Sequence, residues 1–254
     1  MIAVVQMQAQ VIEPPAPQLG NFSEDFEPTW GSDRLRLMEG GRHLQLSLDS
    51  FSGSGVKSKK GYLFAKTDMQ IKLVQGDSAG TVTSYYLSSS TPNKDGLQFD
   101  FLGNESGEPY IVQTNVFVNG VGGREQRIHL WFDPTMDFHT YTIFWTPGLV
   151  QFLVDKTPIR VFKKINELPY LDKQAMQIYL SIWNGDNWAT RGGLAKINWA
   201  HAPFFTSYRN FVVKPAPVTP PVNFTLFSFV KNNYLVYDYC LDRARYPLFP
   251  LECY

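Results

Sequence analysis

One stretch of the sequence, Asn93–Gly103 (NKDGLQFDFLG), carries polar side chains at the spacing of a strand face. Because every second residue of a β-strand points the same way, one face holds Lys94, Gly96, Gln98 and Asp100. A cation, an amide and a carboxyl group beside a residue without a side chain suit the floor of a cleft. Such groups can transfer a proton or stabilise charge, as isomerisation and cyclisation require.

The opposite face of the same stretch is apolar. Leu97, Phe99 and Phe101 alternate with the polar residues and are predicted to face the core, and the alternation directs Asp95 to that side as well. The stretch is therefore a strand that separates a hydrophobic core from a polar surface.

The rest of the chain supplies the elements that must position this strand. Strand-like alternation recurs at 26–48, 61–74, 80–89, 115–120, 127–132, 140–145, 149–154 and 159–162. Turns fall at Glu39-Gly40-Gly41 and Gly122-Gly123, and only 166–174 and 223–239 could be helical. Strands of this length with frequent turn signals predict an all-β fold, a two-sheet antiparallel sandwich.

Proline-rich segments divide the chain into three parts. Residues 1–25 read as an N-terminal arm, 26–212 as the sandwich, and 213–254 as a C-terminal extension packed on it. Pro215–Pro221 is predicted to be the linker to that extension.

Composition excludes several classes of partner. The 254 residues have a formal net charge of zero, so no electrostatic footprint for nucleic acid or an anionic membrane is expected. No apolar run approaches the ~20 residues that span a bilayer. Aromatic residues at 15% suit a carbohydrate or apolar-ligand binder, although a large sandwich also uses aromatics in its core.

Signals for secretion are mixed. The N-terminus MIAVVQMQAQ has no basic region and too short an apolar stretch for a signal peptide, so it reads as the start of a mature form or of a non-secreted protein. Three glycosylation sequons, at Asn21, Asn104 and Asn223, favour secretion.

The two cysteines, Cys240 and Cys253, are close together in the sequence. A disulfide between them would close a short loop that contains Pro247 and Pro250, and would stabilise the fold by roughly 3 kcal/mol. Two reduced thiols remain the alternative.

No motif for a cofactor or metal emerges. His43, His129, His139 and His201 lack metal-ligand spacing, and neither a nucleophile elbow nor a glycine-rich dinucleotide motif is present. We therefore predict no cofactor and no metal site.

Several longer segments resemble plant xyloglucan endotransglucosylase/hydrolases of glycoside hydrolase family sixteen. These are GYLFAKTDMQIKLVQGDSAGTVTSYYLSS, FDFLGNESGEPYIVQTNVFVNGVGGREQRIHLWFDPTMDFHTYTIFW, SIWNGDNWATRGG and YDYCLDRARYPLFPLECY. The resemblance covers about residues 26–254. It implies a concave jelly-roll β-sandwich, secretion to the plant cell wall, and a cleft for xyloglucan or a related β-glucan.

The catalytic strand of that family reads HDEIDFEFLG, where this chain has NKDGLQFDFLG. By this resemblance Lys94 replaces the histidine, Gly96 the nucleophile, Gln98 the helper aspartate and Asp100 the acid/base glutamate. A retaining glycosidase needs two carboxyl groups about 5–5.5 Å apart. Gly96 cannot supply one, so hydrolysis and transglycosylation are predicted to be absent, including any residual transfer by Asp100 alone.

The resemblance also implies which residues would line the cleft. They are Tyr86 on the donor side, Gln113, Asn115 and Arg127 in the middle and on the acceptor side, Trp183 and Trp188 as apolar faces for sugars, and Asp186, Asn187 and Gly192 in the adjoining loop. Alternatively, these residues are kept for folding.

Two functions from different classes follow. In the first, the protein binds xyloglucan or another β-glucan without cleaving it. In the second, the cleft performs acid/base chemistry on a small molecule with Lys94 and Asp100, although those two residues could equally form only an ion pair. The oligomeric state is not predicted.

Overall fold

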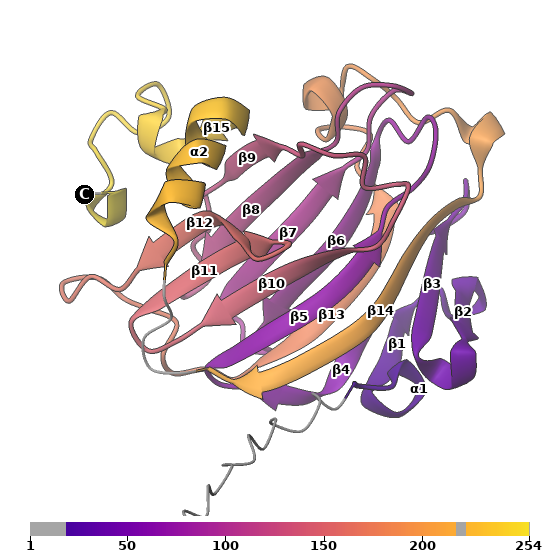
Figure 1. Ribbon diagram of the computed structural model, residues 1–254, viewed down its shortest axis with the longest axis horizontal. Helices are drawn as coiled ribbons and strands as arrows, with labels where there is room; N and C mark the ends of the chain where they lie inside the picture. Colours follow the sequence, from indigo (N-terminus) through magenta and orange to yellow (C-terminus); the bar gives the residue numbers. More distant parts are fainter. Residues whose placement is uncertain (1–18, 217–221, 254) are drawn as a thin grey trace, which may run out of the picture.

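The computed structural model describes residues 19–216 and 222–253, which form two antiparallel β-sheets packed one behind the other (Figure 1). The eight-stranded sheet has the order β1 (Phe26–Trp30), β4 (Ser54–Tyr62), β13 (Met176–Asn184), β6 (Thr81–Ser88), β7 (Gly96–Leu102), β8 (Ile111–Phe117), β9 (Gln126–His129) and β15 (Leu235–Asp238). The predicted all-β sandwich is confirmed.

The seven-stranded sheet covers the other side of the core. Its order is β12 (Thr157–Lys163), β11 (Leu149–Val154), β10 (His139–Trp145), β5 (Ala65–Lys72), β14 (Phe204–Pro215), β3 (His43–Leu48) and β2 (Leu35–Met38). The predicted turn at Glu39-Gly40-Gly41 joins β2 to β3 as a short 3-10 turn. The patterning of Phe26–Leu48 therefore belongs to both sheets, because β1 pairs with β4 whereas β2 and β3 lie in the second sheet.

The core forms where β7 meets the second sheet. Leu97, Phe99 and Phe101 are completely buried, as their alternation predicts. The ring of Phe99 stacks on Tyr85 and meets Phe152 edge-on, with centroids 5.9 and 5.1 Å apart. Aromatic pairs at these distances stabilise a core beyond the area that they bury.

A charged residue joins the two sheets inside this core. Arg160 of β12 is 1% exposed and donates from Nη1 to the carbonyl oxygen and hydroxyl of Thr114 in β8, at 3.0 and 3.1 Å. Its guanidinium also lies over the rings of Phe152 and Tyr239. Burial lowers the pKa of Arg160 to about 10, so it remains charged at neutral pH.

Helices are few in the part of the chain that the structure describes. The α-helices are α1 (Phe22–Asp25) and α2 (Phe224–Tyr234), and 3-10 turns cover Ser32–Arg34, Glu39–Gly41, Thr190–Gly193, Trp199–His201, Tyr239–Leu241 and Leu251–Cys253. The helix considered at 223–239 is therefore helical only over Phe224–Tyr234, because β15 follows α2 directly. β15 joins the sheet because Tyr237 and Asp238 pair with Arg127 and Gln126 of β9.

The second helix considered, at 166–174, is wrong, since this segment forms turns and bends. Pro169 removes a backbone donor and restricts the residue before it, which opposes a helix. Tertiary contacts then hold the segment open: the Tyr170 hydroxyl donates to the carbonyl of Thr146 at 2.8 Å, and the Trp145 indole donates to the carbonyl of Leu171 at 3.0 Å. The strands β13 and β14 were not predicted from the sequence.

The described part of the predicted N-terminal arm packs on the sandwich. Phe22 of the predicted N-terminal arm is buried against Phe26 and Phe211, while residues 1–18 lie outside the described residues. The boundary expected at residue 213 falls inside β14, which runs to Pro215, and 217–221 of the expected linker are also outside the described residues.

The C-terminal extension is fixed at several points. Asp238 of β15 accepts hydrogen bonds from the Gln126 amide at 3.1 Å and from the backbone of Cys240 at 3.1 Å, and it pairs with Lys231 of α2. The predicted disulfide between Cys240 and Cys253 is present and closes the tail. In Figure 1 the extension lies at the β9 end of the eight-stranded sheet.

Replacing Phe99 with alanine tests the importance of the contact between β7 and the second sheet. We expect Phe99→Ala to lower the free energy of unfolding by about 3–5 kcal/mol, because it opens a cavity among four aromatic rings. Urea unfolding followed by tryptophan fluorescence measures the loss. Phe51→Ala is the control, since Phe51 is 90% exposed and its loss should cost less than about 0.5 kcal/mol. Equal losses in the two variants would contradict this picture.

Candidate functional site

The strand register aligns the polar residues of β7 with those of its neighbours on the outward side of the eight-stranded sheet. Asp100 lies between Ser84 of β6 and Gln113 of β8. Gln98 lies between Tyr86 and Asn115, and Gly96 lies between Ser88 and Phe117. We call the outward residues of β13, β6, β7, β8 and β9 the polar face.

Asp100 is the most chemically distinctive group of the polar face. It is 9% exposed, and its Oδ1 accepts a hydrogen bond from the Ser84 hydroxyl at 2.6 Å. The indole Nε1 of Trp183 donates to that same hydroxyl at 3.1 Å, so the three side chains form a hydrogen-bonded chain. Burial raises the pKa of Asp100 to about 6, although the hydrogen bond from Ser84 opposes the shift.

Gln98 lies next to a pair of stacked tyrosines. Tyr86 of β6 and Tyr179 of β13 are opposite each other, with centroids 4.9 Å apart and planes nearly parallel. Burial, then Tyr179 and Asp100, raise the pKa of Tyr86 to about 12, so it remains a neutral phenol. An aromatic pair beside an amide presents both an apolar surface and hydrogen-bonding groups.

Gly96 is buried, yet the backbone there does not require glycine. A Cβ at this position would lie 3.5 Å from the carbonyl oxygen of Leu87 and 3.5 Å from the Cβ of Phe117, which are ordinary contacts. The position therefore has room for at least a small side chain. The lack of a side chain at Gly96 therefore removes a possible functional group and is not needed to avoid a steric clash.

Lys94 lies apart from Gly96, Gln98 and Asp100, with which it was predicted to share a strand face. It is exposed and precedes β7 by two residues, so six residues of extended chain, roughly 20 Å, separate it from Asp100. The ion pair considered between these two residues is not among those formed by residues 19–216 and 222–253. The Ser84 hydroxyl is the partner of Asp100 instead.

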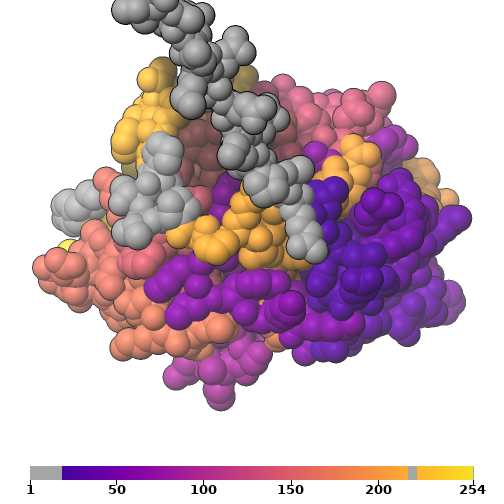
Figure 2. Space-filling view, turned by 60° about the horizontal axis from the view of Figure 1, so that its bottom comes forward, coloured from indigo at the N-terminus to yellow at the C-terminus, as the bar shows by residue number. Residues whose placement is uncertain are grey.

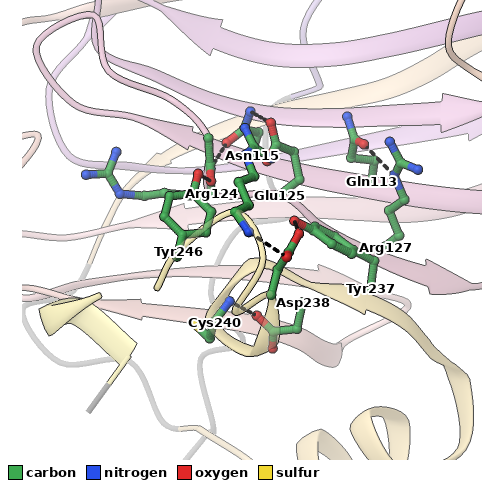
Figure 3. A network of polar contacts seen from close by, with 12 residues as sticks. Gln113, Asn115, Arg124, Glu125, Arg127, Tyr237, Asp238, Cys240 and Tyr246 are labelled. Atoms are coloured by element: carbon green, nitrogen blue, oxygen red, sulfur yellow. Dashed lines mark hydrogen bonds and ion pairs between the residues drawn. The ribbon is translucent and has the colours of Figure 1, made fainter. Parts of the chain in front are cut away.

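The residues predicted for the middle and acceptor side of the cleft belong to a network that includes the C-terminal extension (Figure 3). The Nε of Arg127 donates to the Gln113 side-chain oxygen at 2.8 Å, and the guanidinium lies 5.9 Å from the ring of Tyr237. Asn115 donates to Glu125 at 3.4 Å, and Glu125 pairs with an arginine of the tail. The cleft residues predicted here are therefore held by the extension.

A pocket of about 220 Å³ lies at this end of the polar face. It is lined by Gln113, Glu125, Arg127, Trp188, Tyr237 and Arg245. Three of these, Glu125, Tyr237 and Arg245, were not predicted, nor were Ser84 and Tyr179. Ser84 and Tyr179 share a face with predicted residues, so a correct register would have identified them.

The two tryptophans lie on either side of a loop. Trp183 is the last residue but one of β13 and Trp188 lies in the turn that follows the strand, with ring centroids 5.9 Å apart. Asp186 has a structural role in the loop, because its Oδ1 accepts from the backbone of Ile197 at 2.6 Å. Asn187 is exposed, and Gly192 is exposed with open space around its Cα.

The three predicted glycosylation sites differ in their surroundings. The Asn21 amide caps α1 and donates to the carbonyl of Gly40 at 2.9 Å, with Gly41 packed against it. Asn104 donates to the carbonyl of Pro109 at 3.0 Å. Asn223 caps α2 through its oxygen and is exposed, which leaves its nitrogen accessible.

The described residues contain no group of three or more His, Cys, Asp or Glu side chains that could hold a metal ion. None of their helices is long and apolar enough to cross a membrane.

Comparisons with solved structures support the same architecture. A β-1,3-1,4-glucanase (lichenase) from a mouse hindgut metagenome superposes with a TM-score of 0.61 at 23% identity, covering 77% of this chain and 97% of the other. The apo Crh5 transglycosylase gives a TM-score of 0.58 at 23% identity, covering 76% and 79%. At this level of identity the likeness establishes the jelly-roll fold alone.

The sequence comparisons are closer. The family model for glycosyl hydrolases family 16 matches residues 22–201, and the model for the xyloglucan endo-transglycosylase C-terminus matches 223–253. Together with the fold, the first match defines a family 16 glycoside hydrolase scaffold.

Two curated relatives narrow this class. Xyloglucan endotransglucosylase protein 1 of Diospyros kaki is 50% identical over 252 residues, covering 92% of this chain and 88% of the relative. Xyloglucan endotransglucosylase/hydrolase 2 of Glycine max is also 50% identical, covering 92% and 89%. The chain belongs to the xyloglucan endotransglucosylase/hydrolase family.

The buried carboxyl of Asp100 should make stability depend on pH. Its pKa is 3.8 in an unstructured chain and about 6 in the fold, so the folded state binds the proton more tightly. Stability from this group is full below about pH 4 and falls by about 3 kcal/mol as the pH rises past 6. Urea unfolding between pH 4 and 8 should show this fall in the wild type and not in Asp100→Asn.

A second variant separates burial from hydrogen bonding. Ser84→Ala removes a donor to the carboxylate, so the pKa of Asp100 should rise further, and the loss of stability should begin at the same pH but extend to higher pH. Carboxyl carbon chemical shifts followed by NMR report the pKa directly. An unchanged or lowered value in Ser84→Ala would contradict the assignment.

Proposed function

We propose that this protein binds xyloglucan or a related β-glucan chain and does not cleave it. The observation that carries the proposal is Gly96, which stands where the family resemblance places the nucleophile, in a position with room for a side chain. A position that has room for a side chain and carries none is best explained by loss of the reaction with retention of the fold.

The carboxyl groups of the polar face support this reading. Asp100 carries the single carboxyl of β7, and Asp95, just before the strand, is 1% exposed on the core side and accepts from the backbone of Asn119 at 2.8 Å. Retaining and inverting glycosidases both require a second carboxylate near the scissile bond. Glu125, the acidic residue that lines the pocket at one end of the polar face, is already bound to Arg245.

The aromatic residues of the polar face are the expected contacts for sugar rings. Tyr86 with Tyr179, and Trp183 with Trp188, provide apolar surfaces on β6, on β13 and in the turn after β13, all on one side of β7. Gln98, Gln113 and other amides provide donors and acceptors for hydroxyl groups. This arrangement suits an extended chain that crosses the sheet.

The names of the relatives suggest where this protein acts and which polysaccharide it meets. Two of them are named for xyloglucan, and we propose that this protein also meets that polysaccharide, in the cell wall after secretion. The sequons and the disulfide fit an oxidising compartment.

A second candidate function is acid/base chemistry on a small molecule. The observation in its favour is Asp100, whose pKa of about 6 lets one carboxyl both donate and accept a proton near neutral pH. Lys94 does not contact it. If a turnover is found, Asp100→Asn should abolish it, and Lys94→Ala tests whether the exposed lysine takes part.

Affinity electrophoresis on xyloglucan-containing gels tests the binding proposal. We expect xyloglucan to slow the migration of the wild type. In Trp188→Ala this retardation should be at least ten-fold smaller, because the pocket loses its aromatic wall. Phe224→Ala is the control, since Phe224 is 59% exposed on α2 and should not matter. A wild type that migrates alike with and without xyloglucan would refute the proposal.

Restoring carboxyl groups tests why cleavage is absent. The wild type should not incorporate fluorescent xyloglucan oligosaccharides into polymer. The triple variant Gly96→Glu, Gln98→Asp, Asp100→Glu should gain detectable incorporation, because it supplies both carboxyl groups in an accommodating strand. Activity in the wild type would show that another residue has replaced the nucleophile.

A further inference from the structure

A second row of outward polar side chains lies on the other sheet. Gln45 of β3 is opposite Ser207 of β14, which is opposite Lys72 of β5. Two residues earlier in β14, Phe205 is opposite Ser47. Burial alternates along each strand, so these residues all point away from the core. We call Gln45, Lys72, Phe205 and Ser207 the outer row.

The outer row forms part of a hollow in the surface. A pocket of about 470 Å³ lies over it and is closed on one side by the loop from Leu73 to Asp77 and on another by His201 and Pro203. Its volume falls within the range of about 300–1,000 Å³ that is usual for small-ligand sites. In the space-filling view, the orange atoms of β14 lie among the indigo and purple atoms of the first hundred residues (Figure 2).

The side chains of the outer row are available to a ligand. Gln45, Ser207 and Lys72 make no side-chain hydrogen bond or ion pair to any described residue. The next row along the same strands is different, because Gln70 accepts from Arg209 at 3.0 Å and from Asn210 at 2.8 Å. The free donors and acceptors are therefore a local property of this row.

Phe205 adds an apolar surface to these polar groups. It is 46% exposed, whereas its neighbour Phe204 is 3% exposed and packs into the core. An exposed aromatic ring next to an amide, a hydroxyl and an ammonium group offers contact for the C–H face of a sugar and hydrogen bonds for its hydroxyl groups.

The charges of the pocket argue for a neutral ligand. His201 pairs with Asp77 at 3.3 Å, and Lys72 is the other charged side chain of the lining. Positive and negative groups thus nearly balance, which gives little attraction for a phosphate or a carboxylate. A polyhydroxylated, uncharged molecule matches the site best.

We infer that the outer row is a second binding site for a neutral glucan segment, so that one molecule holds two polysaccharide chains. This inference rests on the proposed function for the first chain, which lies on the polar face. The two sites are on the outward sides of opposite sheets of the sandwich. One straight chain cannot occupy both, and binding at two sites makes the protein a cross-bridge with the gain in avidity that bivalency provides.

Isothermal titration with xyloglucan oligosaccharides tests the second site. The wild type should bind two oligosaccharides per molecule, and Phe205→Ala and Ser207→Ala should each bind one, with affinity for the lost site reduced at least ten-fold. Phe224→Ala, which removes a similarly exposed phenylalanine elsewhere, should keep both. Thermal unfolding checks that each variant is folded.

Bridging gives an independent measurement. Beads coated with xyloglucan should cluster when wild-type protein is added and should remain dispersed with Phe205→Ala or with Trp188→Ala. Clustering that is undiminished by Phe205→Ala and Ser207→Ala, with unchanged stoichiometry, would overturn the second site.

The outcomes separate the two proposals. One site in the wild type that is lost in Trp188→Ala would overturn the second site and leave the proposed function standing. Binding that survives in Trp188→Ala and disappears in Phe205→Ala would overturn the proposed function of the polar face and support the outer row. No binding in any form would overturn both.

Discussion

The alternation of side chains along β7 ties the core of this protein to its polar face. Phe99 and Phe101 fix the strand by packing against both sheets, and the residues between them can only point outward. A slip of one residue would bury Gln98 and Asp100 and expose the phenylalanines. The buried rings of Phe99 and Phe101 therefore determine which way the polar side chains of β7 point.

The strands beside β7 hold the polar side chains of this face in place. Ser84 and Trp183 hold Asp100 from one side, while β9 and β15 hold Arg127 and Tyr237 at the other. Gln113 and Asn115 are also held by side-chain hydrogen bonds, to Arg127 and Glu125 respectively. Such a face is suited to recognition of a fixed ligand shape, because little ordering is needed on binding.

The sequence predicted much of this arrangement, and the failures have physical causes. The alternation of Leu97, Phe99 and Phe101 correctly gave the core side of β7, and Cys240 and Cys253 correctly gave the disulfide. The pattern of a single strand does not reveal how it aligns with its neighbours. Ser84 and Tyr179, which lie beside predicted residues only through that alignment, were therefore missed. The long strands β13 and β14 were missed as well. The separation of Lys94 from Asp100, by contrast, follows from six residues of extended chain and could have been foreseen from the predicted strand.

The pairing of β15 with β9 has a consequence for how the molecule is made. Residues 235–238 complete one edge of the eight-stranded sheet, and Arg245 completes the pocket beside it. These residues leave the ribosome after the strands to which they attach. Chains shortened before residue 235 would therefore contain most of the sandwich and lack this edge of the sheet, because domains that form during synthesis begin from the other terminus. The pocket gains its last lining residue only after Arg245 has been synthesised.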